Sequence, residues 1–216
     1  MFELLFLFLF IILGLIVISF VRTVIVGSGA KRDETEIWVH HELNKRLSAG
    51  QYIIFSDLII PSTSEKIRST QIDHVIVSIY GIFCLETKSH QGSIYGGYKS
   101  KYWKQYLGGK SYDLYSPIRQ NHHHVKSLEY LIRSRIKAPV HSYLVFPSAK
   151  KIMLNGNRVD FTLSATVERI LNHTRQVYSF EDVTAISKGL AIVSSPSDLL
   201  REEHIESVKK YIENHR

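Results

Sequence analysis

A run of 18 residues without charge, residues 4–21, lies close to the N-terminus. As a helix this segment covers about 27 Å, close to the roughly 30 Å hydrocarbon core of a bilayer. The run exceeds the apolar part of most signal peptides and no basic residue precedes it, although the small residues at 27–30 leave cleavage open as an alternative. The sequence therefore predicts a transmembrane anchor over residues 1–26 that contacts the lipid bilayer through residues 4–21.

Basic residues follow this run and none precedes it. Cytoplasmic flanks of membrane spans carry the excess of Lys and Arg, so the C-terminal side is expected in the cytoplasm. The expected localisation is the cell membrane, single-pass, with the remaining chain as a cytoplasmic domain behind a short linker over residues 27–32. The basic residues are Arg22, Lys31, Arg32, Lys45 and Arg46.

The remaining chain alternates helical and extended patterns without an internal repeat. The order αβββ and then αβ predicts one mixed α/β domain, with a core over 33–150 and a C-terminal extension over 151–216 that holds a hairpin and helices. The predicted elements are a helix at 33–47, strands at 52–60, 71–79 and 82–88, a helix at 116–135, a strand at 140–146, a hairpin at 151–163 and a tail helix from 196.

The positive charge is concentrated in the middle of the chain. Residues 61–138 carry 12 basic and 5 acidic side chains, which accounts for the whole net charge of +7. A localised positive field favours a polyanionic partner, and solubilising surface charge is the alternative. The single cysteine, Cys84, excludes internal disulfide scaffolds and Cys-based zinc sites.

Two carboxylates and a lysine come together on the predicted hairpin. With Tyr80-Gly81 as a two-residue loop, Asp73 faces Lys88, and Asp73 and Glu86 are diagonal neighbours about 7–8 Å apart. Charges at the end of apolar strands are costly unless they pair or bind a metal. This pattern indicates an oxygen-ligand site for Mg²⁺ or Mn²⁺ beside a lysine, and a solvated cluster at the hairpin end is the alternative.

The stretch QIDHVIVSIYGIFCLETKSHQGSIYG, with a Glu-bearing helix before it and SPIRQN after it, resembles the nuclease-related domain (NERD) family. That family is similar to the restriction-endonuclease-like PD-(D/E)xK superfamily, and the resemblance covers about residues 33–145. It implies a single restriction-endonuclease-like αβββαβ core. It also implies metal ligands at Asp73 and Glu86, a catalytic Lys88, and further catalytic residues at Glu36 and Gln120.

The sequence departs from the family pattern at two places. Arg32 and Thr35 replace glycines near the first glutamate, and Ser116 replaces the Asn of an Asn-Pro-x-x-Gln motif. The metal ligands are unaffected by these changes. Only the placement of Glu36 and of the turn at Ser116 depends on them.

The amino acids themselves leave alternatives at several of these positions. Glu36 shares an apolar helical stripe and so needs a partner, for which capping or exposure is the alternative. On the later helix either Gln120 or its neighbour Asn121 could face the site. Residues 122–124 are three consecutive histidines, whose side chains point about 100° apart on a helix and cannot converge on one ion.

Seven aromatic residues between 95 and 115 interleave with lysines. Aromatic rings that stack on bases and lysines that meet phosphates are typical of single-stranded nucleic-acid binding. Half-exposed tyrosines on short strands are the alternative. The predicted nucleic-acid-binding residues are Lys99, Lys101, Trp103 and Lys104.

The function that these observations favour is a membrane-tethered, cytosol-facing nuclease that hydrolyses phosphodiester bonds with Mg²⁺ or Mn²⁺. The expected partner is nucleic acid, with DNA preferred to RNA, and no protein partner is predicted. The alternatives are an inactive nucleic-acid-binding module on the membrane and a protein-interaction module.

Overall fold

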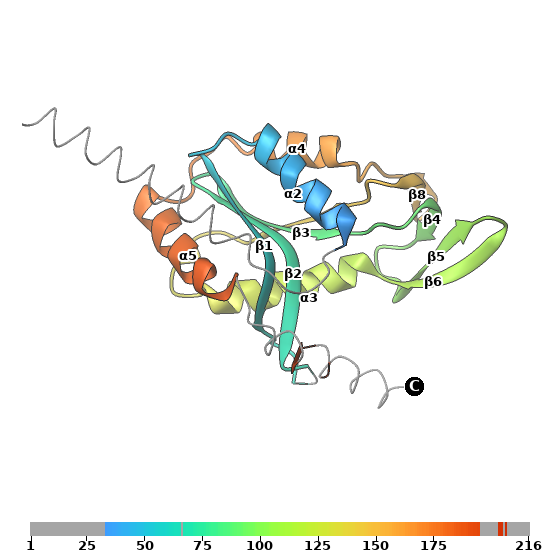
Figure 1. Cartoon of the computed structure of the whole chain (residues 1–216), viewed down its shortest axis with the longest axis horizontal. Helices are drawn as coiled ribbons and strands as arrows, with labels where there is room; N and C mark the ends of the chain where they lie inside the picture. The colour runs from blue at the N-terminus through green and yellow to red at the C-terminus, as the bar shows by residue number, and fades with distance from the viewer. Residues whose placement is uncertain (1–32, 66, 195–202, 205, 207–216) are drawn as a thin grey trace, which may run out of the picture.

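The computed structural model describes residues 33–65, 67–194, 203, 204 and 206. Two β-sheets and four helices are found among them (Figure 1), which confirms the predicted mixed α/β class. The elements are α2 (Glu34–Arg46), β1 (Tyr52–Pro61), β2 (Ser69–Ser78), β3 (Gly81–Thr87), β4 (Gly92–Gly96), β5 (Tyr102–Leu107), β6 (Lys110–Tyr115), α3 (Pro117–Leu131), β7 (His141–Val145), β8 (Ala149–Leu154), β9 (Asn157–Arg158), α4 (Leu163–Leu171) and α5 (Phe180–Val193).

Two predictions lie mainly outside the described residues. These are the anchor with its linker, over 1–32, and the tail helix from 196. In the part of the chain that the structure describes, no helix combines the length and the apolar character needed to cross a bilayer.

The central sheet has the strand order β1-β2-β3-β7. The first three strands are antiparallel, and β7 runs parallel to β3 after the α3 crossover. Figure 1 shows α2 and α4 on one face of this sheet and α3 and α5 on the other. The sequence α2-β1-β2-β3-α3-β7 is therefore the αβββαβ order that was predicted, with β4–β6 inserted between β3 and α3.

Local sequence explains where the two site-bearing helices begin. The side chain of Asp33 accepts the N–H of Thr35 at 2.9 Å and caps α2. Ser116 caps α3, and Pro117 follows at the first helical position, where no N–H is needed. Ser116, which departs from the family motif, thus keeps the turn through its own hydroxyl.

The β2–β3 turn differs from the prediction. Its two loop residues are Ile79 and Tyr80, because Ser78 pairs with Gly81 in the ladder. The Ser78 hydroxyl accepts the N–H of Tyr80 at 3.1 Å and donates to the carbonyl of Gly81 at 3.2 Å. These bonds of the Ser78 side chain favour a two-residue loop that begins one residue earlier than predicted.

The predicted register is wrong by two residues. Val75 pairs with Cys84, and continuing this register brings Asp73 opposite Glu86 rather than Lys88. Because the shift is an even number, Val75 and Cys84 still share one face, in the cluster packed against α3 and α5. The correction moves the two carboxylates from diagonal to directly facing positions.

A buried acidic residue, Asp57, lies in the middle of β1. The pairing of β1 with β2 keeps one register on either side of it, which places Asp57 opposite Asp73. Asp57 has φ 58°, a conformation that few non-glycine residues adopt, and its Oδ1 accepts from Gln71 Nε2 at 2.7 Å. Figure 1 shows one end of β1 and β2 curving away from β3.

The second sheet has the order β6-β5-β4-β8-β9. One face buries Ile94, Trp103 and Leu114 against Leu144 and Phe146. Its β8–β9 turn confirms the predicted hairpin around residues 155–157. Helices α4 and α5 lie in the C-terminal extension where helices were predicted, but their bounds were not predicted.

Candidate active site

The two predicted carboxylates meet where β2 and β3 separate. Antiparallel pairing ends at His74 and Leu85, so Asp73 and Glu86 lie just beyond the last ladder pair. There the backbone N–H of Thr87 donates to Asp73 Oδ2 at 2.7 Å. The Asp73 carboxylate thus replaces a strand carbonyl, and this bond holds it beside Glu86.

Each oxygen of the Glu86 carboxylate lies next to a basic side chain. Lys88 Nζ is 2.5 Å from Oε1 and His124 Nε2 is 3.1 Å from Oε2, and Glu86 itself is only 1% exposed. Burial raises the pKa of Glu86, but contact with His124 and the charge of Lys88 outweigh burial and hold the pKa below its usual value. Glu86 is therefore a carboxylate at neutral pH.

His124 connects α3 to both strands of the site. Its Nδ1 lies 2.7 Å from Thr70 Oγ1 on β2, while Nε2 lies beside Glu86 at an angle that falls short of a hydrogen bond. Its neighbours behave differently, since His122 is exposed and His123 contacts Ser62. The three histidines do not converge, as predicted, but the buried one supports the site and was missed. The position of His124 on the apolar stripe of α3 could have indicated from the sequence that it is buried.

Asp73 stands in a more negative environment than Glu86. Burial, followed by the charges of Glu86 and Glu36, raises its pKa well above the usual value, against the opposing effects of the Thr87 N–H and Lys88. Glu36 is half-buried on α2, and its charge acts on Asp73. The structure therefore brings Glu36, Glu86 and Lys88 within electrostatic reach of Asp73.

The donor set suits a hard cation. Carboxylate oxygens are the ligands that Mg²⁺ and Mn²⁺ prefer, and the repulsion that raises the pKa of Asp73 is relieved by added positive charge. Within the described residues, no three His, Cys, Asp or Glu side chains are gathered closely enough to hold an ion as they stand. The residues thus fit a metal in charge and ligand type, but not in their present spacing.

Of the two amides on α3, the buried one has a structural role. Asn121 Nδ2 lies 2.8–3.1 Å from Cys84 O, Ser142 Oγ and Tyr143 O, and its Oδ1 accepts from Cys84 Sγ at 3.2 Å. These contacts connect α3 to β3 and β7. They also show that Cys84, the single cysteine, is packed in the core. Gln120, one residue earlier, is half-buried, and its catalytic role stays a prediction.

Residues 31–147, more than half of the chain, match the family model described as nuclease-related domain. The chain belongs to the nuclease-related domain family. This confirms the resemblance and places the chain in the restriction-endonuclease-like superfamily.

A curated relative of this NERD-family chain is "Uncharacterized protein pXO1-01" of Bacillus anthracis. The two are 38% identical over 68 residues, which cover 32% of each chain. The chain therefore matches about a third of the length of that relative. No solved structure matches the chain.

The predicted nucleic-acid-binding residues of the NERD-family chain lie on the second sheet, but they differ in access. Lys99 and Lys101 are exposed, and Lys104 Nζ lies 2.6 Å from Asp113 Oδ1. Trp103 is 1% exposed, and its indole N–H donates to Gly97 O at 3.1 Å. Trp103 therefore packs in the core of the second sheet, and its ring is not accessible to a base.

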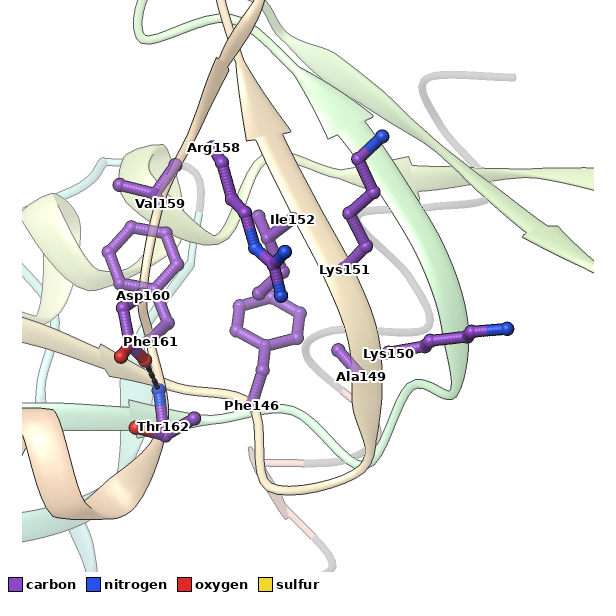
Figure 2. A pocket seen from close by; sticks show the side chains of 10 residues that line it. All are labelled: Phe146, Ala149, Lys150, Lys151, Ile152, Arg158, Val159, Asp160, Phe161 and Thr162. Atoms are coloured by element: carbon purple, nitrogen blue, oxygen red, sulfur yellow. Dashed lines mark hydrogen bonds between the residues drawn. The ribbon is translucent and has the colours of Figure 1, made fainter.

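A cavity of about 360 Å³ opens at the β8–β9 end of the second sheet. Figure 2 shows Arg158 extending toward Phe146, whereas Lys150 and Lys151 point outward from β8. Asp73, Glu86 and Lys88 do not line this cavity. It is a feature of the second sheet, separate from the carboxylate cluster.

Proposed function

We propose that this NERD-family chain is a metal-dependent nuclease that hydrolyses phosphodiester bonds. The observation that carries the proposal is the asymmetric carboxylate pair at the split between β2 and β3. Glu86 is held ionised by two basic partners, while Asp73 is crowded by negative charge. A purely structural ion pair needs only Lys88 and Glu86, so the additional acidic groups are explained by a cationic ligand.

In this proposal Asp73 and Glu86 hold a Mg²⁺ or Mn²⁺ ion, and Glu36 faces the same region from α2. When bound, the ion supplies positive charge that polarises the phosphate and favours deprotonation of an attacking water. The charge of Glu86 is maintained by His124, whose ring is braced by Thr70.

Lys88 has a second role in this proposal. Its side chain is 18% exposed, so it contacts Glu86 and still reaches solvent. From there its ammonium donates hydrogen bonds to a phosphate oxygen or orients a water molecule. Charge that develops on the phosphate in the transition state is thereby stabilised.

Nucleic acid is the proposed substrate, with DNA preferred to RNA. The family match supports nucleic acid as the substrate class, and so does the excess of 12 basic over 5 acidic residues within 61–138, which attracts phosphate backbones.

The test is cleavage by the purified full-length chain, held in a mild detergent, of single- and double-stranded DNA and RNA. Reactions contain Mg²⁺, Mn²⁺ or EDTA. Asp73→Asn and Glu86→Gln are expected to abolish cleavage, and Lys88→Ala to lower it by roughly 10²-fold or more. Matched controls are Glu168→Gln and Lys188→Ala, which alter exposed charges on α4 and α5 and should leave the rate unchanged.

Retained cleavage in Asp73→Asn or Glu86→Gln would refute the assigned site. No cleavage by the parent chain, combined with salt-sensitive binding, would favour the binding-only alternative.

We also propose that residues 4–21 anchor the domain to the cell membrane with its C-terminal side in the cytoplasm. The support is the uncharged run of 18 residues followed by positive charge. A reporter enzyme fused after Arg216 should be active only in the cytoplasm. Activity outside the cytoplasm would overturn the orientation, and a mature N-terminus near residue 30 would overturn the anchor.

A further inference from the structure

Four tyrosines project from one face of the second sheet. Alternation along β5 places Tyr102 and Tyr106 on the side opposite the buried Trp103, and pairing adds Tyr115 from β6 and Tyr95 from β4. These four side chains are 40–54% exposed. They form two edge-to-face pairs, Tyr102 with Tyr115 and Tyr95 with Tyr106, with ring centroids 6.1 and 5.4 Å apart. We call this surface the tyrosine face.

The tyrosine face lies on a closely packed support. A Cβ at Gly96 would lie 2.4 Å from the Trp103 ring, and a Cβ at Gly92, where φ is +77°, would lie 2.3 Å from the carbonyl oxygen of Tyr106. Both glycines let neighbouring strands and the indole approach more closely than any side chain allows. The rings are therefore presented from a sheet with little freedom to rearrange.

Positive charge surrounds the tyrosine face. Residues 92–115 and 149–158, which make up the second sheet and its turns, contain seven basic residues and one acidic residue. Lys101 Nζ lies 5.3 Å from the centre of the Tyr102 ring, and Lys151 Nζ lies 5.7 Å from that of Tyr95. The one acidic residue, Asp113, is paired with Lys104. The face thus combines exposed rings with two lysine cations that lie over rings at Tyr102 and Tyr95.

We propose that the tyrosine face binds single-stranded nucleic acid, with bases stacked on the tyrosine rings and phosphates beside Lys101 and Lys151. Stacking needs free base faces, which a duplex keeps inside its own stack. A membrane or an acidic protein matches the charge but leaves the ring faces without a partner. This proposal rests on the proposed function for its substrate class and names the form of that substrate.

The tyrosine face is also close to the carboxylate cluster along the chain. Strand β4 begins at Gly92, four residues after Lys88, so the two Cα atoms are at most about 14 Å apart. The start of the second sheet is therefore close to the end of β3 that carries the site.

The experiment measures binding in EDTA, which separates it from cleavage. Fluorescence anisotropy of the full-length chain in detergent is recorded with labelled oligothymidylate, oligouridylate and a duplex of equal length. Tyr102→Ala and Tyr106→Ala should each weaken single-strand binding about 5- to 150-fold, the range for loss of one stacked base. Tyr102→Phe should keep the affinity, because it keeps the ring.

Tyr130→Ala is the matched control, since Tyr130 is 56% exposed but lies on α3 away from the second sheet. Replacing Lys101 and Lys151 together by Ala should flatten the salt dependence of log affinity by about 1 to 2 units. Unfolding of each variant is followed by circular dichroism, and only variants with the parent melting curve are compared.

Unchanged affinity in both tyrosine variants, an equal loss in Tyr130→Ala, or tighter binding of duplex than of either single strand would each overturn the proposal. Dimerisation that these tyrosine variants abolish would assign the face to a second copy instead. The two proposals fail separately: tyrosine-dependent binding without cleavage by the parent chain would refute only the nuclease. Metal-dependent cleavage with tyrosine-independent binding would refute only the tyrosine face.

Discussion

Neutralising the two site carboxylates should change stability in opposite directions. Glu86→Gln keeps the size of the side chain, but it replaces one carboxylate oxygen with an amide NH₂ group. That group is a hydrogen-bond donor and would face another donor, on Lys88 or His124. Breaking a buried pair costs about 3–5 kcal/mol, and the partial exposure of Lys88 favours the lower end. For a chain of this size about 3 kcal/mol corresponds to a melting temperature about 6–12 °C lower.

Asp73→Asn should instead stabilise the metal-free protein. The Asn oxygen can still accept the N–H of Thr87, while the charge repelled by Glu86 and Glu36 is gone. Loss of this repulsion is therefore expected to raise the melting temperature of the metal-free protein at neutral pH.

The difference in stability between Asp73→Asn and the parent protein should depend on pH. Because the folded-state pKa of Asp73 is raised, the native protein loses stability as pH rises from the ordinary pKa of Asp through that raised pKa. Asn does not titrate, so the advantage of Asp73→Asn should vanish below the ordinary pKa and grow with pH. Thermal melts followed by circular dichroism in EDTA, across acidic to neutral pH, measure this difference.

Two results would refute this reasoning. One is an Asp73→Asn protein that is destabilised as much as Glu86→Gln at neutral pH. The other is an advantage that does not depend on pH. Added Mg²⁺ provides a further comparison, because an ion that binds only the folded parent raises its melting temperature and should not raise that of either variant.

Two further substitutions test the support around the site and the second sheet. His124→Ala should lower the free energy of unfolding by about 1–3 kcal/mol, because it removes the ring beside the buried Glu86 Oε2 and takes away the hydrogen-bond partner of Thr70 Oγ1. His122→Ala, at an exposed position of the same helix, should leave denaturant midpoints unchanged. Gly96→Ala should cost about 1–3 kcal/mol because its Cβ would meet Trp103. A parent-like midpoint for Gly96→Ala would contradict the tight packing described for that sheet.

The order of the core elements could be predicted from the sequence because strong local signals mark them. Apolar runs stop at Pro61 and at the β2–β3 turn, and Ser116-Pro117 begins α3. No comparably strong signal marks the bounds of α4 and α5. Of the helices expected in the C-terminal extension, only the tail helix from 196 was given a starting residue. Their buried residues pack on a sheet that only the tertiary structure defines.

The identity of the site residues could be predicted further than their geometry. Asp73, Glu86 and Lys88 follow a spaced pattern that survives an error in register, because a two-residue shift keeps side chains on the same face. The register itself depends on hydrogen bonds from the Ser78 side chain, which spacing does not reveal. For Trp103 the predicted role was wrong. Its place among aromatic residues and lysines suggested an exposed ring, whereas the alternation of side chains along β5 places it in the core.

The insertion of β4–β6 between β3 and α3 connects the second sheet to the carboxylate cluster through the chain. Strand β3 brings Glu86, and α3 brings His124 back to the same carboxylate after the excursion through the second sheet. The chain that carries the tyrosine face is therefore tied at both ends to the two elements that hold Glu86.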